Sequence, residues 1–311
     1  MIIDLPDTTT SQVAKNLVKA REEGGVVALG RVLTLVIAAT DDVAESAIDA
    51  ANDASREHPM RVIVLTTSEG ESRLDAQIRV GGDAGASEVV VLHAYGDAAS
   101  NEESLVTGLL LPDAPVVVWW PREAPEAPAA SPLGRIAQRR ITDAATARDV
   151  RAQLEVLGHK HVPGDTDLAW TRLTHWREQL AAVLDQPPYD EVTAVEVRGS
   201  AASPSTALLA GWLRLALDVP VRWAYESPHV WQEGIKSVRL TRANGDILLE
   251  RPVPGSAVLT QPGQPDHELH LPRRTLRECL AEELRRLDPD VLYGRVITEG
   301  WELLEAPEPV A

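Results

Sequence analysis

Three short apolar segments in the first 120 residues restrict the possible fold more than any other feature of this chain. Residues 31–37, 60–65 and 115–120 are rich in Val, Ile and Leu, and none of them alternates cleanly between apolar and polar side chains. Strands that other elements cover on both faces have this pattern. Helical patterns over 41–54 and 101–111 lie between the segments, and parallel strands need such crossover connections. The sequence therefore predicts an N-terminal α/β domain with a mostly parallel, doubly wound-like sheet.

The second half of the chain predicts a mixed sheet with antiparallel hairpins. Asn244-Gly245 lies between two strand-like segments, 237–242 and 246–251, and this dipeptide is typical of a tight hairpin turn. We expect further strands at 191–197, 219–225, 257–260 and 268–271, and helices at 204–217 and 275–287.

A length of 311 residues favours two domains. Residues 133–141 and 145–158 have helical patterns, and residues 159–163 resemble a hinge. We therefore expect two mixed α/β domains, at 1–160 and 161–311.

The segment that follows this hinge predicts one continuous helix over 166–185. Pro163-Gly164 ends the preceding element, and Asp165 or Thr166 can cap the first turn. One face of this helix is apolar and contains Ala169, Leu173, Trp176, Leu180 and Val183. The opposite face has an unusual composition for a solvated surface: Asp167, Trp170, Thr171, Thr174 and Glu178, with Arg177 next to Trp170.

Two interpretations of this second face stay open. The helix is buried on both sides, because large aromatic side chains are usually packed, or its second face docks a partner or ligand. The spacing favours the first interpretation. The second makes partner-binding candidates of Asp165, Asp167, Trp170, Thr171 and Arg177.

Trp119 and Trp120 close the strand at 115–120 and must point to opposite faces of the sheet. We expect one indole in the core and the other near the carboxyl end of the strand, where open α/β sheets hold ligands and partners. Trp120 and Pro121 are therefore further partner-binding candidates. The proline-rich segment 121–132 that follows is an exposed connection or a lid, and the first is favoured.

No motif for cofactor binding or catalysis is recognisable in the sequence. The glycine-rich stretch 81–85 precedes a strand instead of joining a strand to a helix, so we interpret it as a plain turn. The loop 199–203 does lead from a strand into a helix, and Gly199, Ser200 and Ser203 could bind an anion there. Because no lysine is nearby, an ordinary helix cap is the favoured interpretation. We expect no cofactor and no catalytic residues.

Metal binding and thiol chemistry are also not expected. His159 and His161, with Asp165 nearby, could chelate a metal, but we interpret them as structural or exposed. His267 and His270 face opposite sides of a strand. Cys279 is the only cysteine, and its place beside an apolar helical stripe predicts a buried, inert thiol.

A formal net charge of −17 argues against nucleic acid and against an anionic membrane surface as partners. The N-terminus lacks a basic region followed by an apolar one, and no apolar run is long enough to cross a bilayer. We therefore expect a cytoplasmic location.

Four segments resemble the OpcA family, the bacterial glucose-6-phosphate dehydrogenase assembly proteins. These segments are Ala51 to Pro59, Val118 to Pro121, Gln138 to Asp143, and Pro163 to Arg177. The resemblance implies a non-catalytic protein that binds glucose-6-phosphate dehydrogenase, promotes its active oligomer and raises its activity, at the NADP-reducing first step of the pentose phosphate pathway. It adds Arg139 and Arg140 to the partner-binding candidates. Met60, and not a cysteine, follows His58-Pro59, and Cys279 is the only cysteine. A switch that needs two thiols within one chain is therefore excluded.

Two other classes of function stay open at this point. One is an enzyme or metabolite sensor that binds a phosphosugar at the 199–203 loop. The other is a structural scaffold without effect on the activity of its partner.

Overall fold

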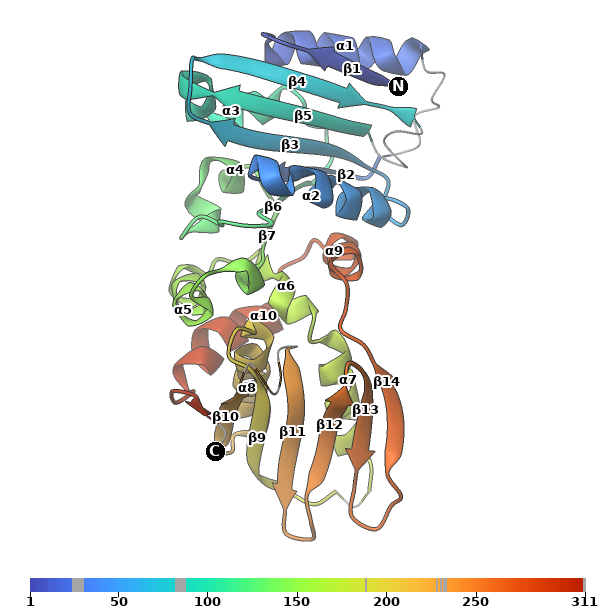
Figure 1. Cartoon of the computed structure of the whole chain (residues 1–311), viewed down its shortest axis with the longest axis vertical. Helices are drawn as coiled ribbons and strands as arrows, with labels where there is room; N and C mark the ends of the chain where they lie inside the picture. Colours follow the sequence, from blue (N-terminus) through green and yellow to red (C-terminus); the bar gives the residue numbers. More distant parts are fainter. Residues whose placement is uncertain are drawn as a thin grey trace. The chain divides into compact units, whose positions relative to one another are not determined.

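The computed structural model describes residues 1–23, 31–81, 88–187, 189–227, 229, 231 and 234–309 (Figure 1). The predicted plain turn at 81–85 lies outside these residues, except for Gly81. Within the described residues, no helix is both long and apolar enough to cross a membrane.

The chain divides into two compact units, and each unit is made of three separate segments of the sequence. The first unit comprises Met1–Asp143, Gly164–Thr166 and Leu276–Pro289, and the second comprises Ala144–Pro163, Asp167–Thr275 and Asp290–Ala311. A single division at residue 160 therefore differs from the observed one. The physical reason is that a late segment returns to the first unit, where its helix packs on an early helix.

The first unit contains a mostly parallel sheet with the strand order β1-β4-β5-β3-β2-β6-β7-β8 in the described residues. Strand β4 pairs antiparallel with β1 and β5, whereas the pairs from β5 to β7 are parallel. The strands are β1 (Ile2–Leu5), β2 (Leu33–Ala38), β3 (Met60–Ser68), β4 (Arg73–Arg79), β5 (Glu88–Tyr95), β6 (Val116–Trp119), β7 (Arg139–Thr142) and β8 (Asp165–Asp167).

Helices cover both faces of this sheet, as the non-alternating strands predict. The helices are α1 (Thr10–Glu23), α2 (Asp41–Ala54), α3 (Glu102–Thr107), α4 (Pro132–Arg135) and α9 (Leu276–Arg285). α1, α3 and α4 share one apolar cluster with Val36, Ile63, Val90 and Val118. α2 packs on β3 and α9. Leu35 and Ile37, which point away from the first cluster, are fully buried too.

The predicted helix at 133–141 is wrong in its second half. Only Pro132–Arg135 is helical, and Arg139–Thr142 forms strand β7, parallel to β6. Gln138 explains the change, because its amide N–H donates to the Val116 carbonyl at 2.9 Å and its side-chain oxygen accepts from the Val116 N–H at 2.6 Å. Both bonds hold the chain at the start of β6 in an extended path.

The second unit contains a mixed sheet with the order β14-β13-β12-β11-β9-β10-β15 in the described residues. β9, β10 and β15 are parallel, and the remaining pairs are antiparallel. The hairpin predicted at Asn244-Gly245 is confirmed between β11 and β12, where Gly245 has a φ of +119°. The strands are β9 (Val192–Ser200), β10 (Val221–Glu226), β11 (Ile235–Arg242), β12 (Ile247–Val253), β13 (Gly255–Thr260), β14 (His267–Leu271) and β15 (Glu308–Pro309).

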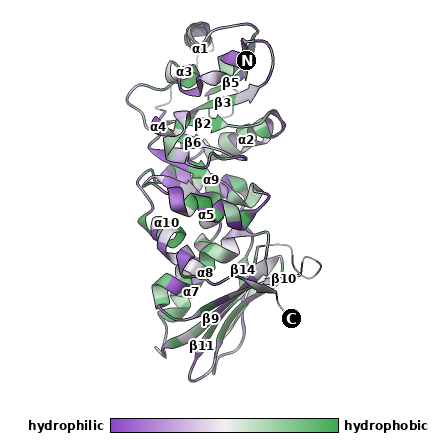
Figure 2. Cartoon of the chain, turned by 90° about the vertical axis from the view of Figure 1, so that its left-hand side faces the viewer, coloured by the Kyte–Doolittle hydropathy of each residue, from purple (hydrophilic) through white to green (hydrophobic). Residues whose placement is uncertain are grey.

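One face of this second sheet carries the helices and the apolar core. The core joins Val197 and Val238 of the sheet to Leu209, Trp176 and Trp170 of the helices, and hydropathy along each element can be followed in Figure 2. The helices are α5 (Val150–Lys160), α6 (Leu168–Thr171), α7 (Thr174–Leu184), α8 (Pro204–Leu217) and α10 (Val291–Arg295), with a π-helical segment at Val296–Gly300. The predicted class, two mixed α/β parts, is confirmed.

Candidate functional site

Arg139 and Arg140 lie on β7 and form buried ion pairs within the first unit. Arg140 pairs with Asp165 at the start of β8, and its Nη1 donates to the Ala137 carbonyl at 2.9 Å. Arg139 Nε donates to Glu283 of α9 at 2.9 Å. None of these four side chains is more than 9% exposed, so both ion pairs lie inside the unit. Direct contact of Arg139 and Arg140 with a partner stays a prediction. Their geometry joins β7, β8 and α9.

Asp167 caps helix α6 and is fully buried. Its Oδ1 accepts from the Ala169 N–H at 2.8 Å, and its Oδ2 accepts from the Ala144 N–H at 2.9 Å. These bonds satisfy amide groups that the first turn of a helix leaves without partners. The aspartate is therefore a structural cap in the second unit.

The continuous helix predicted over 166–185 is wrong, because the segment forms β8, α6 and α7 in succession. Two carbonyls near the break accept bonds from distant side chains. Ala169 O accepts from the Ser205 hydroxyl at 2.8 Å, and Thr171 O accepts from Arg274 Nη1 at 2.8 Å. The Leu173 N–H then bonds to Trp170 O, three residues back, which tightens the turn where α6 ends.

Trp170 lies inside the second unit with only 1% of its surface exposed. Its indole N–H donates to Asp290 Oδ2 at 2.8 Å, and its ring centroid lies 6.1 Å from that of Tyr293. The Arg177 guanidinium lies over the ring, with Cζ 3.9 Å from the centroid. Thr171 is equally buried. Trp170 and Thr171 are therefore packed inside the second unit, as the interpretation of a segment buried on both sides expects. Partner binding through Asp165, Asp167, Trp170, Thr171 and Arg177 stays a prediction.

Trp119 and Trp120 are both buried, at 0% and 6% exposure. Trp120 directly follows the carboxyl end of β6, as expected, and its contact with a partner stays a prediction. Trp120 belongs to the apolar cluster beneath α1, α3 and α4. Pro121 is half-exposed at the start of the proline-rich segment. That segment contains a short 3-10 turn at Pro128–Ala130, and Pro128 is buried against the fold.

The loop 199–203 lines a cavity of about 190 Å³ in the second unit. Ser200 ends β9, and Ser203 is the N-cap residue of α8, although its hydroxyl makes no capping hydrogen bond. The backbone at Gly199 is tightly packed, because a Cβ there would lie 2.5 Å from Thr206 Oγ1 and 2.6 Å from the Gly234 carbonyl oxygen. The ordinary cap favoured from the sequence is therefore not formed by the Ser203 side chain.

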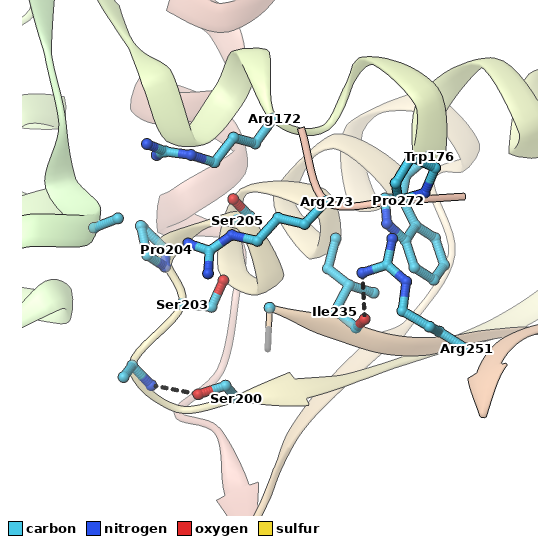
Figure 3. A pocket seen from close by; sticks show the side chains of 13 residues that line it. Arg172, Trp176, Ser200, Ser203, Pro204, Ser205, Ile235, Arg251, Pro272 and Arg273 are labelled. Atoms are coloured by element: carbon cyan, nitrogen blue, oxygen red, sulfur yellow. Dashed lines mark hydrogen bonds between the residues drawn. The ribbon is translucent and has the colours of Figure 1, made fainter. Parts of the chain in front are cut away.

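Three arginines from distant positions of the sequence line the same cavity (Figure 3). Arg172 follows α6, Arg251 lies on β12, and Arg273 follows β14. Arg273 reaches toward Ser203 and Pro204 in Figure 3, while Arg251 lies beside Trp176. The sequence did not point to these arginines, because none of them is near the 199–203 loop in the sequence. Only the fold of the sheet brings β12 and the end of β14 next to α8.

His161 and Cys279 are packed within their units, whereas His159, His267 and His270 are exposed. The His161 ring packs edge-on against Tyr293, with centroids 5.7 Å apart. Cys279 is fully buried on α9, which confirms the predicted burial of this thiol. Among the described residues, no three His, Cys, Asp or Glu side chains are grouped so that they could hold a metal ion.

The solved structures that resemble this chain include three oxidoreductases, all at low similarity. The proteins from Sinorhizobium meliloti, Thermotoga maritima and Pseudomonas syringae are 10%, 11% and 10% identical to this chain, with TM-scores of 0.42, 0.41 and 0.38. The matches cover 85%, 87% and 90% of this chain, and 86%, 95% and 92% of the respective structures. Similarity this low carries no argument about activity.

Comparison with protein families gives a specific result. Residues 51–159 match the glucose-6-phosphate dehydrogenase subunit N-terminal domain, and residues 163–297 match the C-terminal domain of the same subunit. No curated protein matches the chain. The two family models together span most of the chain, in the expected order. The chain therefore belongs to the OpcA family of glucose-6-phosphate dehydrogenase assembly proteins.

Proposed function

We propose that this chain is a non-catalytic assembly factor that binds glucose-6-phosphate dehydrogenase, promotes its active oligomer and raises its activity. The observation that carries the proposal is the match of both halves to domains of a glucose-6-phosphate dehydrogenase subunit. In this role the chain acts in the cytoplasm on the supply of NADPH by the oxidative pentose phosphate pathway. The oxidation itself takes place in the dehydrogenase.

The buried candidate residues act indirectly in this proposal. Trp170 donates to Oδ2 of Asp290, and Oδ1 of the same carboxylate caps α10 by accepting from the Tyr293 N–H at 2.9 Å. The first residues of α10, Val291 and Leu292, are 73% and 39% exposed. Trp170 therefore positions a helix that presents apolar side chains to solvent.

Val162 is a further exposed apolar residue, and its chain neighbour contacts α10. It is 43% exposed, and its neighbour His161 packs on Tyr293 and lies close to Gly294 of α10. Adjacent exposed apolar residues are typical of protein interfaces. We assign the patch of Val162, Val291 and Leu292, here called the α10 patch, as the first surface to test for contact with the dehydrogenase.

The decisive experiment measures dehydrogenase kinetics and oligomer mass with and without this chain. We expect added chain to raise the activity and shift the dehydrogenase to its active oligomer. The chain alone, with NADP and glucose 6-phosphate, should show no reduction of NADP. Co-elution without a kinetic change would support a scaffold instead, and NADP reduction by the purified chain would contradict the non-catalytic role.

Val291→Asp tests the α10 patch without weakening its helix. An acid in the first turn of a helix interacts favourably with the helix dipole, so the fold should be retained. We expect weaker binding to the dehydrogenase. Val253→Asp is the matched control, because Val253 is also an exposed valine of the second unit, at 55%. Equal binding by both variants would exclude the α10 patch as a contact surface. The assembly role would still be tested by the dehydrogenase kinetics and oligomer mass described above.

A further inference from the structure

The cavity beneath α8 concentrates positive charge in an otherwise acidic chain. The net charge of the chain is −17, yet every charged side chain among the described residues that line this cavity is an arginine: Arg172, Arg251 and Arg273. Three positively charged side chains around one cavity favour an anion inside it.

Arg251 lines the cavity, and hydrogen bonds hold its side chain in place. It is only 3% exposed, and its guanidinium donates to the carbonyls of Leu271 at 2.6 Å and of Ile235 at 3.5 Å. Its Cζ lies 5.2 Å from the centroid of the Trp176 ring. These two carbonyls and the indole orient the arginine. The position of this buried cation is therefore set before any ligand arrives.

The opposite wall supplies hydroxyl groups and the start of a helix. Ser203 is the N-cap residue of α8, a helix of 14 residues, and its side chain makes no capping bond. The Ser200 hydroxyl accepts from the Ala202 N–H at 3.3 Å, which leaves its own hydrogen available as a donor to a ligand. Helix N-termini favour negative charge, and here this field adds to that of the arginines.

The rim is accessible from solvent. Arg273 is exposed, Arg172 is half-exposed, and Figure 3 shows the Arg273 side chain directed toward Ser203. A volume of about 190 Å³ corresponds to roughly six water molecules at about 30 Å³ each. This space accommodates a small metabolite.

We propose that this cavity binds a small phosphate monoester, with Arg172, Arg251, Arg273 and Ser203 holding the phosphate group. A phosphate carries a charge of about −1.5 to −2 at pH 7 and three strong acceptor oxygens, which match several guanidinium groups better than a single carboxylate does. The proposal concerns the chain alone and does not rest on the proposed assembly function.

The test is a ligand titration of the full chain in the absence of dehydrogenase. Melting temperature and calorimetric affinity are measured with inorganic phosphate, glucose 6-phosphate, glucose and citrate as probes, at an ionic strength kept constant with chloride. We expect saturable stabilisation by inorganic phosphate and glucose 6-phosphate, and none by glucose or citrate. No saturable effect of the phosphates, or equal binding of citrate, would overturn the proposal.

Arg273→Gln and Ser203→Ala place the ligand in this cavity. Arg273 is exposed and Ser203 makes no capping bond, so both variants should fold normally. Each removes a donor to the phosphate, and for the arginine we expect an affinity for glucose 6-phosphate weaker by about tenfold or more. Arg286→Gln is the matched control, because Arg286 is an exposed arginine of α9's C-terminal flank outside the cavity. Equal affinity of wild type, Arg273→Gln and Ser203→Ala would refute the assignment.

Discussion

Glu283 on α9 accepts a hydrogen bond at 2.9 Å from Nε of Arg139 on β7, although 144 residues separate the two in sequence. Both side chains are at most 5% exposed. The same arginine donates through Nη1 to the Asp288 carbonyl at 2.8 Å. These contacts fix the late segment 276–289 to the first sheet, so they hold together parts of the chain that are distant in sequence.

Removal of one partner of this pair should be strongly destabilising. Glu283→Ala leaves a buried guanidinium without its carboxylate, and we expect the free energy of unfolding to fall by about 3–5 kcal/mol. Urea denaturation measures the change. The control is Arg285→Ala, which removes an exposed ion pair to Glu57 at 3.1 Å and should change stability by less than about 1 kcal/mol. Similar losses in both variants would contradict the role given to burial.

Trp170 should behave as a core residue. Trp170→Ala is expected to destabilise the fold by about 3–5 kcal/mol, as for other large-to-small changes in a core. Trp170→Phe retains a ring but loses the bond to Asp290, at a cost of about 1–3 kcal/mol. Tyr189→Ala, at a side chain that is 73% exposed, is the control and should shift stability by about 0.5 kcal/mol at most. A Trp170→Ala variant that melts like wild type would favour the docking interpretation.

Gly158 should not tolerate a methyl group, even though it lies in helix α5. Alanine is favoured over glycine in helices by about 1 kcal/mol. Here, however, a Cβ would lie 2.5 Å from the Ile297 carbonyl oxygen. We expect Gly158→Ala to lower the melting temperature, with a loss of about 1–3 kcal/mol. In the control Gly108→Ala, the nearest atom is Thr10 Cγ2 at 3.4 Å, so only a small change is expected.

Glu196 should make stability depend on pH. Burial raises the pKa of its carboxyl, but the hydrogen bonds and charges of Arg198 and Arg222, at 2.6 and 2.7 Å, together lower the pKa below its ordinary value. A depressed carboxyl pKa gives stability that is present above the unfolded-state pKa and is lost as the pH falls through the folded-state pKa.

Wild type should therefore exceed Glu196→Gln in stability at pH 7, and the difference should shrink as the pH falls below about 4.3. Denaturation curves of both proteins across this range provide the measurement. Glu268→Gln, at an exposed position of β14, controls for the general effect of acid. A constant difference between wild type and Glu196→Gln would contradict the prediction.

Local patterns in the sequence determined the elements whose signals are contained in a few neighbouring residues. The apolar segments gave β2, β3 and β6, and helices α2 and α8 were predicted with the bounds that the structure shows. The hairpin at Asn244-Gly245 follows from the positive φ that its turn requires. The resemblance also identified the family from four short segments.

Tertiary contacts decided the break after Thr171. Side chains from residues 205 and 274 bond to the carbonyls of Ala169 and Thr171, and no pattern within 166–185 contains this information. Tertiary contacts also decided that Arg139–Thr142 is a strand, because its hydrogen-bonding partner is β6.

The candidate sites show the same division between local and distant information. The sequence identified Ser200 and Ser203 as possible anion ligands, because a strand–loop–helix pattern is local. It could not supply Arg172, Arg251 and Arg273, which reach the cavity from separate elements. Amino-acid type and spacing determine which segments are strands and helices, since these depend on neighbouring side chains. The tertiary structure alone decides which charges meet, because that depends on how distant elements pack.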